Sequence, residues 1–157
     1  MTATWKEPLD AVIDVLKANY SASATGSWNR ASTDNIRPVV IDIADEGPER
    51  GKRLDLGRHD YILCYETALN EESPDLLYNY VTTRTNITVD MRTTKSRSRL
   101  RKMEDEMRRV IHNSRKGDGV NFDRMVMKTR TDLSDRTKKL FRHTFQVEVV
   151  TLAELIP

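Results

Sequence analysis

Apolar residues recur at helical spacing in two separate segments of the chain. The first segment follows Pro8, a residue favoured at the first position of a helix, and predicts an amphipathic helix over residues 8–20. The second segment predicts a helix over residues 98–113 with charged residues opposite its apolar stripe. The apolar positions are Leu9, Val12, Ile13, Leu16 and Tyr20 in the first helix and Leu100, Met103, Met107, Val110 and Ile111 in the second. The charged residues opposite the second stripe are Glu104, Asp105, Arg108 and Arg109.

In the rest of the chain, apolar residues recur at every second position or in short continuous runs, and these patterns predict strands. The predicted strands cover residues 39–43, 61–65, 78–91, 125–130 and 141–150. Within the third, Ile87, Val89 and Met91 point one way and the intervening polar residues, Asp90 among them, point to a wet face. The order is therefore α-β-β-β-α-β-β. It predicts an α+β fold with a mostly antiparallel sheet of four to five strands and two main helices packed on one face.

The length of the chain suits one domain. We expect residues 1–157 to form a single α+β domain, because a chain of this size closes one core. Mobile segments are predicted at about 21–37, which is rich in Ser, Ala, Thr and Asn, and at 45–59, which holds glycines and both charge signs. Residues Glu71 to Asp75 read as an acidic turn around Pro74.

Composition narrows the class of protein. Lys and Arg number 26 against 24 Asp and Glu, and a net charge of +2 favours neither a general nucleic-acid binder nor a membrane-surface protein. No segment approaches the roughly 20 apolar residues of a membrane span, and no apolar signal stretch opens the chain, so we expect a cytosolic protein. The single cysteine, Cys64, lies in an apolar run and is expected to be a buried core residue.

Six cations follow one another closely, with no acidic residue among them, where the second helix begins. They are Arg92, Lys95, Arg97, Arg99, Arg101 and Lys102. A helix N-terminus carries partial positive charge and favours anions, so this placement is locally unfavourable. Three explanations remain open for the run: a solvated basic turn, a carboxylate-rich surface of a neighbouring subunit, or the phosphates of nucleic acid. The run has no aromatic residue on which a base could stack.

The chain offers little that points to catalysis or metal binding. A nuclease needs carboxylates and a lysine around a divalent metal, whereas Asp90 and Glu66 stand without such a lysine. The histidines, His59, His112 and His143, lack the short spacing of zinc ligands. Gly47, Gly51 and Gly57 lie between two strands and do not form a phosphate-binding loop. We therefore predict no catalytic residue, no metal site and no cofactor.

The order of elements resembles that of a known protein family. The elements that carry the resemblance are the opening helix 8–20, the pair of strands around the loop 45–60, the junction Asn86-Ile87-Thr88-Val89-Asp90-Met91-Arg92 running into helix 98–113, and the closing strand 141–150. In this order they resemble the tail terminator and tail-completion family of tailed viruses, whose members cap the tail tube where it meets the neck. The resemblance is architectural and covers most of the chain.

This resemblance implies a structural virion protein. The expected protein is not an enzyme and forms a hexameric ring at the head-tail connection, with the tail tube on one face and neck proteins on the other. DNA passes through the lumen without sequence-specific binding, and neither a cofactor nor a membrane is involved. The protein would be found in the tail and neck of the virion and be assembled in the host cytoplasm.

Charge signs suggest where such subunits touch. A heterologous ring contact pairs two different patches, and the basic run 92–102 could meet the acidic residues Glu71, Glu72 and Asp75 of a neighbour. Four cations of the loop 45–59 are further candidate contacts: Arg50, Lys52, Arg53 and Arg58. The alternative function is a nucleic-acid-binding α+β module that uses the basic run, and a more distant one is a small metal-dependent nuclease.

Overall fold

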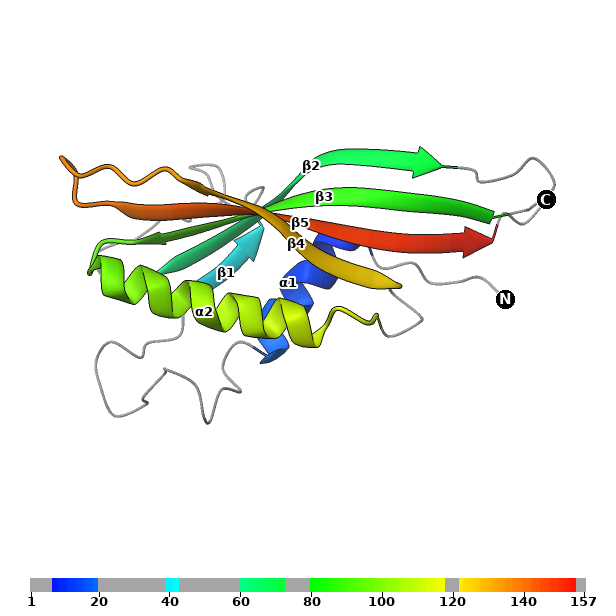
Figure 1. Cartoon of the computed structure of the whole chain (residues 1–157), viewed down its shortest axis with the longest axis horizontal. Helices are drawn as coiled ribbons and strands as arrows, with labels where there is room; N and C mark the ends of the chain where they lie inside the picture. The colour runs from blue at the N-terminus through cyan, green and yellow to red at the C-terminus, as the bar shows by residue number, and fades with distance from the viewer. Residues whose placement is uncertain (1–6, 20–38, 43–59, 73–79, 118–121, 155–157) are drawn as a thin grey trace.

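Two helices and five strands make up the described part of the chain (Figure 1). The computed structural model describes residues 7–19, 39–42, 60–72, 80–117 and 122–154. The elements in chain order are α1 (Pro8–Asn19), β1 (Val39–Asp42), β2 (Tyr61–Glu72), β3 (Tyr80–Thr93), α2 (Arg97–Asn113), β4 (Arg124–Asp132) and β5 (Phe141–Glu154). The predicted α+β fold and its order of elements are confirmed. The segments predicted to be mobile, 21–37 and 45–59, lie outside the described residues.

The five strands form one mixed sheet in the spatial order β1-β2-β3-β5-β4. The pairs β2–β3, β3–β5 and β5–β4 are antiparallel, so the prediction of a mostly antiparallel sheet is confirmed. The exception is β1, which runs parallel to β2 with Val39 opposite Tyr61. A parallel pair requires a connection of roughly a dozen residues or more, and residues 43–60 supply that length between the two strands.

Both helices lie on the same face of the sheet, as predicted (Figure 1). Alternate residues of the two central strands point toward them, including Ile87 and Met91 of β3 and Phe145 of β5, all of them buried. Leu16 of α1 and Met107 of α2 close the core from the other side. Burying one large apolar side chain fully contributes roughly 1.5–3 kcal/mol, so this layer of side chains holds the helices against the sheet.

The helix α2 begins at a serine cap. The Ser96 side chain accepts a hydrogen bond of 3.0 Å from the backbone N–H of Arg99, which satisfies one of the free donors of the first turn. The predicted stripe from Leu100 to Ile111 is buried. The prediction that Glu104 lies on the solvent side is wrong, because this carboxylate is only 5 % exposed and has partners on the sheet.

The antiparallel strands continue well past the helices (Figure 1). The strand β1 pairs only with Tyr61–Cys64, so the remainder of β2 runs on beyond it. Glu71 and Glu72, which we predicted to lie in a turn, are the last two residues of β2. Their pairing with Thr83 and Thr82 of β3, the next strand in the chain, overrides the local turn signal, because the composition of a short window does not include the partner strand.

Candidate functional site

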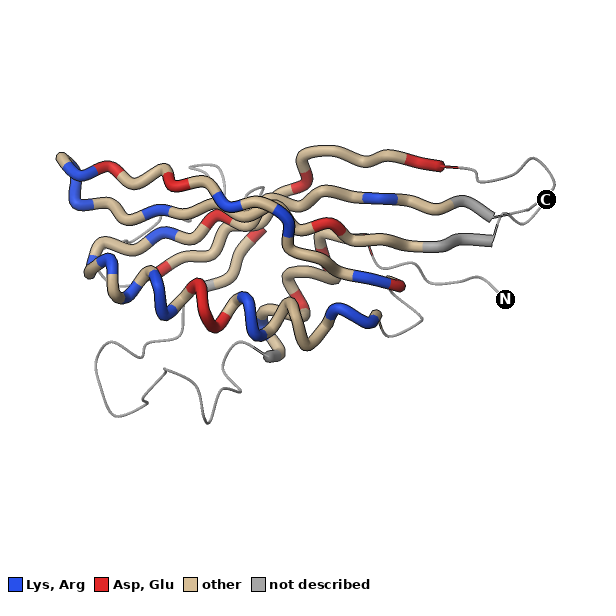
Figure 2. The backbone as a smooth tube through the Cα atoms, viewed as in Figure 1, with Lys and Arg blue, Asp and Glu red and all other residues tan. Residues whose placement is uncertain are grey.

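The predicted basic run is spread over three elements. Arg92 lies near the end of β3, Lys95 lies in the turn that follows, and the other four cations occupy the first two turns of α2. Lys and Arg positions recur along the whole of α2 (Figure 2). The six side chains differ sharply in exposure, from Arg99, which is 2 % exposed, to Arg97 and Arg101, which are open to solvent. They therefore do not act as one patch.

Asp60 neutralises the buried part of this run. Its carboxylate, itself 1 % exposed, accepts a hydrogen bond of 2.6 Å from Nε of Arg99 and another of 2.6 Å from the hydroxyl of Thr93. Nζ of Lys95 lies 3.6 Å from the same carboxylate. The first turn of α2 has no acidic residue of its own, so Asp60 supplies the negative charge that this helix end lacks in the local sequence.

Arg92 is neutralised by a second buried carboxylate, Asp90. Arg92 and Arg142 lie directly opposite each other on β3 and β5, a placement that is unfavourable for like charges. Asp90 Oδ2 accepts hydrogen bonds of 2.8 Å from the guanidinium groups of both arginines. The prediction that Asp90 lies on a wet face is wrong: it is 0 % exposed, because the two arginines and their strands enclose it. Half of the basic run, Arg92, Lys95 and Arg99, is thus paired with buried carboxylates of the same chain.

The remaining cations of the run face outward. Arg97 and Arg101 are exposed and Lys102 is half-buried, and none of the three forms an ion pair with a residue that the structure describes. They lie within the first six residues of α2, at the end of the sheet where β3 stops. These three side chains are the part of the basic run that is available to a partner.

The predicted acidic patch lies at the other end of the sheet. Glu71 and Glu72 are exposed, and Arg84 of β3 is 3.8 Å from Glu72 while it also binds Glu148 of β5 at 3.2 Å. Arg92 lies opposite Tyr61, the first residue of β2, and Glu72 is the last. At about 3.3 Å per residue, the 12 residues of this strand separate the two patches by roughly 35 Å. They cannot neutralise each other within one chain.

Asp75 and the loop cations Arg50, Lys52, Arg53 and Arg58 lie outside the residues that the structure describes. Their predicted roles at an interface remain predictions. The histidine His59 belongs to the same undescribed part of the chain.

A buried histidine and glutamate join α2 to the sheet, a cluster that the sequence did not reveal. Nδ1 of His143 lies 3.0 Å from Glu104, and its Nε2 lies 3.6 Å from Asp132. Glu104 also binds Arg130 of β4 at 3.0 Å and Arg108 at 2.9 Å, the second of these one helical turn along α2. The signal available in the sequence was the placement of His143 on the apolar face of the last strand. This cluster clamps the helix onto β4 and β5.

Cys64 is a core residue, as predicted, and is fully buried. Burial first, and then the negative charges of Asp42 and Asp90, raise the pKa of its thiol from the ordinary value to about 12. The thiol is therefore protonated at neutral pH and is not a nucleophile. Across the described ranges, no three His, Cys, Asp or Glu side chains come together in a way that could hold a metal ion.

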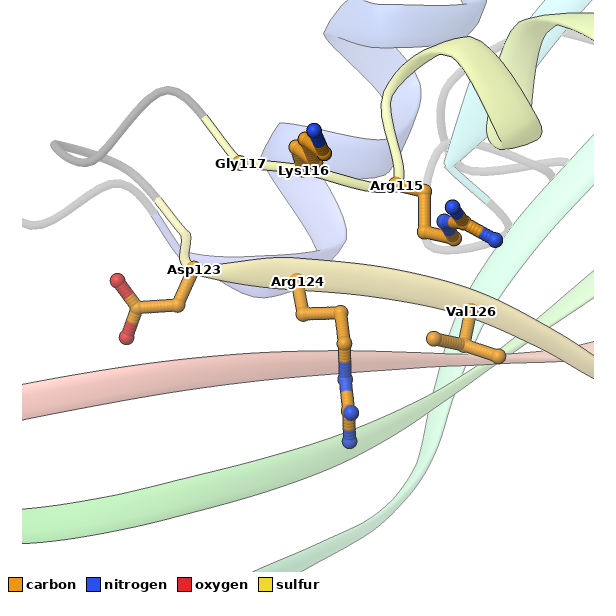
Figure 3. A pocket seen from close by; sticks show the side chains of 6 residues that line it. All are labelled: Arg115, Lys116, Gly117, Asp123, Arg124 and Val126. Carbon is orange, nitrogen blue, oxygen red and sulfur yellow. The ribbon is translucent and has the colours of Figure 1, made fainter.

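An open pocket of about 590 Å³ lies where α2 leads into β4. It is lined by Arg115, Lys116, Gly117, Asp123, Arg124 and Val126, and its charged side chains fan outward from the backbone (Figure 3). Gly117 donates a hydrogen bond of 2.9 Å to the carbonyl of Asp123. A Cβ at this position would lie 1.8 Å from the carbonyl oxygen of Phe122, so the close approach of the two segments requires glycine. The result is a basic corner, without the inward-pointing side chains of a catalytic pocket.

Comparison with known proteins adds no family to this picture. No protein-family model matches the chain, and no curated protein matches it. Neither described helix is long and apolar enough to cross a membrane. The case for a function therefore comes from the fold and its surface.

Proposed function

We propose that this chain is a structural subunit of a tailed virus particle, the tail terminator, which caps the tail tube and joins it to the neck as a hexameric ring. The observation that carries the proposal is the separation of exposed charge along one sheet. Carboxylates stand at the free end of β2, and cations without a described partner stand roughly 35 Å away at the start of α2. The architectural resemblance to the tail terminator family supports the same function.

Separated charge of this kind favours assembly over catalysis. The two patches cannot reach each other within one chain, so each can meet the opposite patch of another copy. Contacts between different patches on successive copies are heterologous, and they close into a ring when the rotation from copy to copy allows it. The buried carboxylates Asp60, Asp90 and Glu104 are all engaged with cations of the same chain, so they stabilise the subunit.

The oligomeric state tests this proposal. Light scattering on a sizing column should give a mass of about six chains, and negative-stain microscopy should show rings with an open lumen. The double variant Glu71→Lys with Glu72→Lys should shift the protein toward smaller species, because it removes the exposed acidic end. The variant Asp105→Lys, which reverses one exposed acidic residue on α2, should leave the mass unchanged. A wild-type chain that stays monomeric at every concentration and salt would rule the proposal out.

One observation favours the alternative of a nucleic-acid-binding module. Arg97, Arg101 and Lys102 form a small group of outward-facing cations on a single helix end, which suits phosphate groups. A monomer that retards DNA in a gel at low salt, and loses this with Arg97→Gln and Arg101→Gln, would establish the alternative. A ring with no such DNA affinity would establish the first function.

A further inference from the structure

The two edges of the sheet differ in how much of each is paired with a neighbouring segment. On one side, β1 covers only the first four residues of β2. The rest of β2, Tyr65–Glu72, pairs with β3 on its inner side and has no neighbouring strand on its outer side in the described part of the chain. This stretch is about 26 Å long, and its residues from Glu66 onward are exposed. Backbone N–H and C=O groups on the outer side of such an edge are open to another strand.

The other side of the sheet ends at β4. Its first residues are covered, since Lys116 pairs with Arg124 and the N–H of Met125 donates to the carbonyl of Arg115. From Val126 to Asp132 the strand has β5 on one side and no described strand on the other. This open edge is about 23 Å long, which matches the free part of β2.

The two open edges carry opposite charge. Tyr65–Glu72 holds Glu66, Glu71 and Glu72 and no cation, which is a formal charge of −3. The open stretch Val126–Asp132 holds two cations, Lys128 and Arg130, and one acid, which is a formal charge of +1, and Arg124 adds a third cation at the covered start of the strand. Acidic positions at the end of β2 and basic positions at the start of β4 lie at the same end of the sheet (Figure 2).

From these edges we infer that β2 of one copy pairs antiparallel with β4 of the next, and that its Glu71 and Glu72 settle against the basic pocket formed by Arg115, Lys116 and Arg124. The inference rests on the proposed function, since it names the contact between neighbouring subunits of the ring, and it gives Glu71 and Glu72 the cations of this pocket as partners in place of those at the start of α2. The partner is a second copy of this chain.

The direction of the strands supports this arrangement. Three antiparallel steps lead from β2 through β3 and β5 to β4, so β2 and β4 run in opposite directions within one sheet. Copies set side by side in the same orientation therefore bring β2 antiparallel to β4, with the helices of every copy on the same side. This repeat adds one subunit after another in the same sense, which a heterologous ring requires.

The register of side chains supports it as well. Each edge contains one irregularity, at Thr67 in β2 and at Lys128–Thr129 in β4. When Glu66 is placed opposite Arg130, the two irregular positions meet and Leu69 falls opposite Met127. Leu69 is 48 % exposed in the single chain, and Met127 is half-buried on the same helix-bearing face of the sheet. The same register places Asn70 opposite Val126, where the open part of the β4 edge begins. Arg115 and Lys116 cover the edge beyond this point, so Glu71 and Glu72 extend past the paired stretch to the rim of the pocket.

Bulges and charges on edge strands also serve to prevent aggregation. For protection against aggregation alone, it would not matter which sign of charge each edge carries. Here the signs are divided between the edges, so that two copies of the same edge repel and the two different edges attract. Three pairings of edges are possible between copies: β2 with β2, β4 with β4, and β2 with β4. The division of charge favours only the last, whereas protection against aggregation would favour none of them.

Disulfide cross-linking tests the inference on the assembled protein. In the register above, Thr67 of one copy lies opposite Thr129 of the next, and both side chains are exposed. The double variant Thr67→Cys with Thr129→Cys should give, after mild oxidation, a ladder of linked chains on a denaturing gel. The matched control, Asn70→Cys with Thr131→Cys, uses exposed positions of the same two edges but lies several positions out of register, beyond the about 7 Å that two Cα atoms of a disulfide can span. It should give no ladder. The native Cys64 is buried and does not interfere.

Charge reversal gives a second readout. Arg124→Glu should weaken self-association about tenfold, whereas Arg97→Glu should leave it unchanged, because the inferred contact uses the cations of the pocket and not those of α2. If the wild-type chain forms rings but only the control pair cross-links, or neither pair does, the edge pairing is overturned while the proposed function stands. If no ring forms at all, the proposed function itself fails.

Discussion

Nε of Arg99 lies 2.6 Å from the carboxylate of Asp60, although the two residues are 39 positions apart in the chain. Both side chains are almost fully buried, at 2 % and 1 % exposure. A buried charge is tolerated when its partner and hydrogen bonds are in place, and it becomes costly when one partner is removed. This pair therefore ties the start of α2 to the residue that precedes β2.

Replacing Asp60 with Asn should destabilise the fold strongly. The substitution keeps the size of the side chain but removes the charge that neutralises Arg99, and breaking a buried ion pair costs about 3 kcal/mol. The free energy of unfolding, measured by urea denaturation, should fall by that amount. Asp105→Asn, which removes an exposed carboxylate of α2, should change it by less than about 0.5 kcal/mol. Equal stability of the two variants would contradict the role given to Asp60.

Asp90 should couple the two arginines that flank it. Asp90→Ala leaves Arg92 and Arg142 opposite each other without the carboxylate, so we expect a loss of about 2–3 kcal/mol in unfolding free energy. Adding Arg142→Gln to Asp90→Ala should recover part of this loss, because it removes the uncompensated repulsion. A double-mutant cycle measures the effect, and strictly additive losses would show that Asp90 and Arg142 act independently.

Cys64 should make stability fall at high pH. Its thiol has a pKa of about 12 in the folded chain against an ordinary value of 9.0, so the unfolded chain loses this proton first as the pH rises. The stabilising contribution is complete below pH 9 and is lost as the pH rises from 9 to 12. Cys64→Ala should show a shallower decline of unfolding free energy over this range than the wild-type chain. A thiol reagent at pH 8 should label the wild-type protein only after unfolding, and rapid labelling of the folded chain would contradict the burial.

Periodicity located every element because it is a local property. The stripe from Leu100 to Ile111 and the alternation at Ile87, Val89 and Met91 each lie within one short window, and both are buried as expected. Where the interpretation was wrong, a distant partner was the reason. Glu104 and Asp90 are charged residues on positions that read as solvent-facing, yet both are buried because Arg130 and Arg142, which come later in the chain, reach them.

The candidate site was only partly visible for the same reason. Arg97, Arg101 and Lys102 stayed on the surface as the charge run indicated, while Arg92, Lys95 and Arg99 found internal partners. The basic pocket was missed, because Arg115 and Lys116 are separated in sequence from Arg124 and meet it only where the two segments approach each other at Gly117. The signal that could have indicated it was the basic pair Arg115-Lys116 before Gly117 and the single cation Arg124 after it.

The amino-acid sequence alone determined the class of fold, the order of its elements and the burial of Cys64, since apolar spacing and composition act within a few residues of each position. Only the tertiary structure decided which cations are neutralised, that β1 runs parallel to β2, and that two open edges of opposite charge bound the sheet. Those features depend on contacts between residues far apart in the chain, and the energy of such a contact exists only once the backbone has brought its members together.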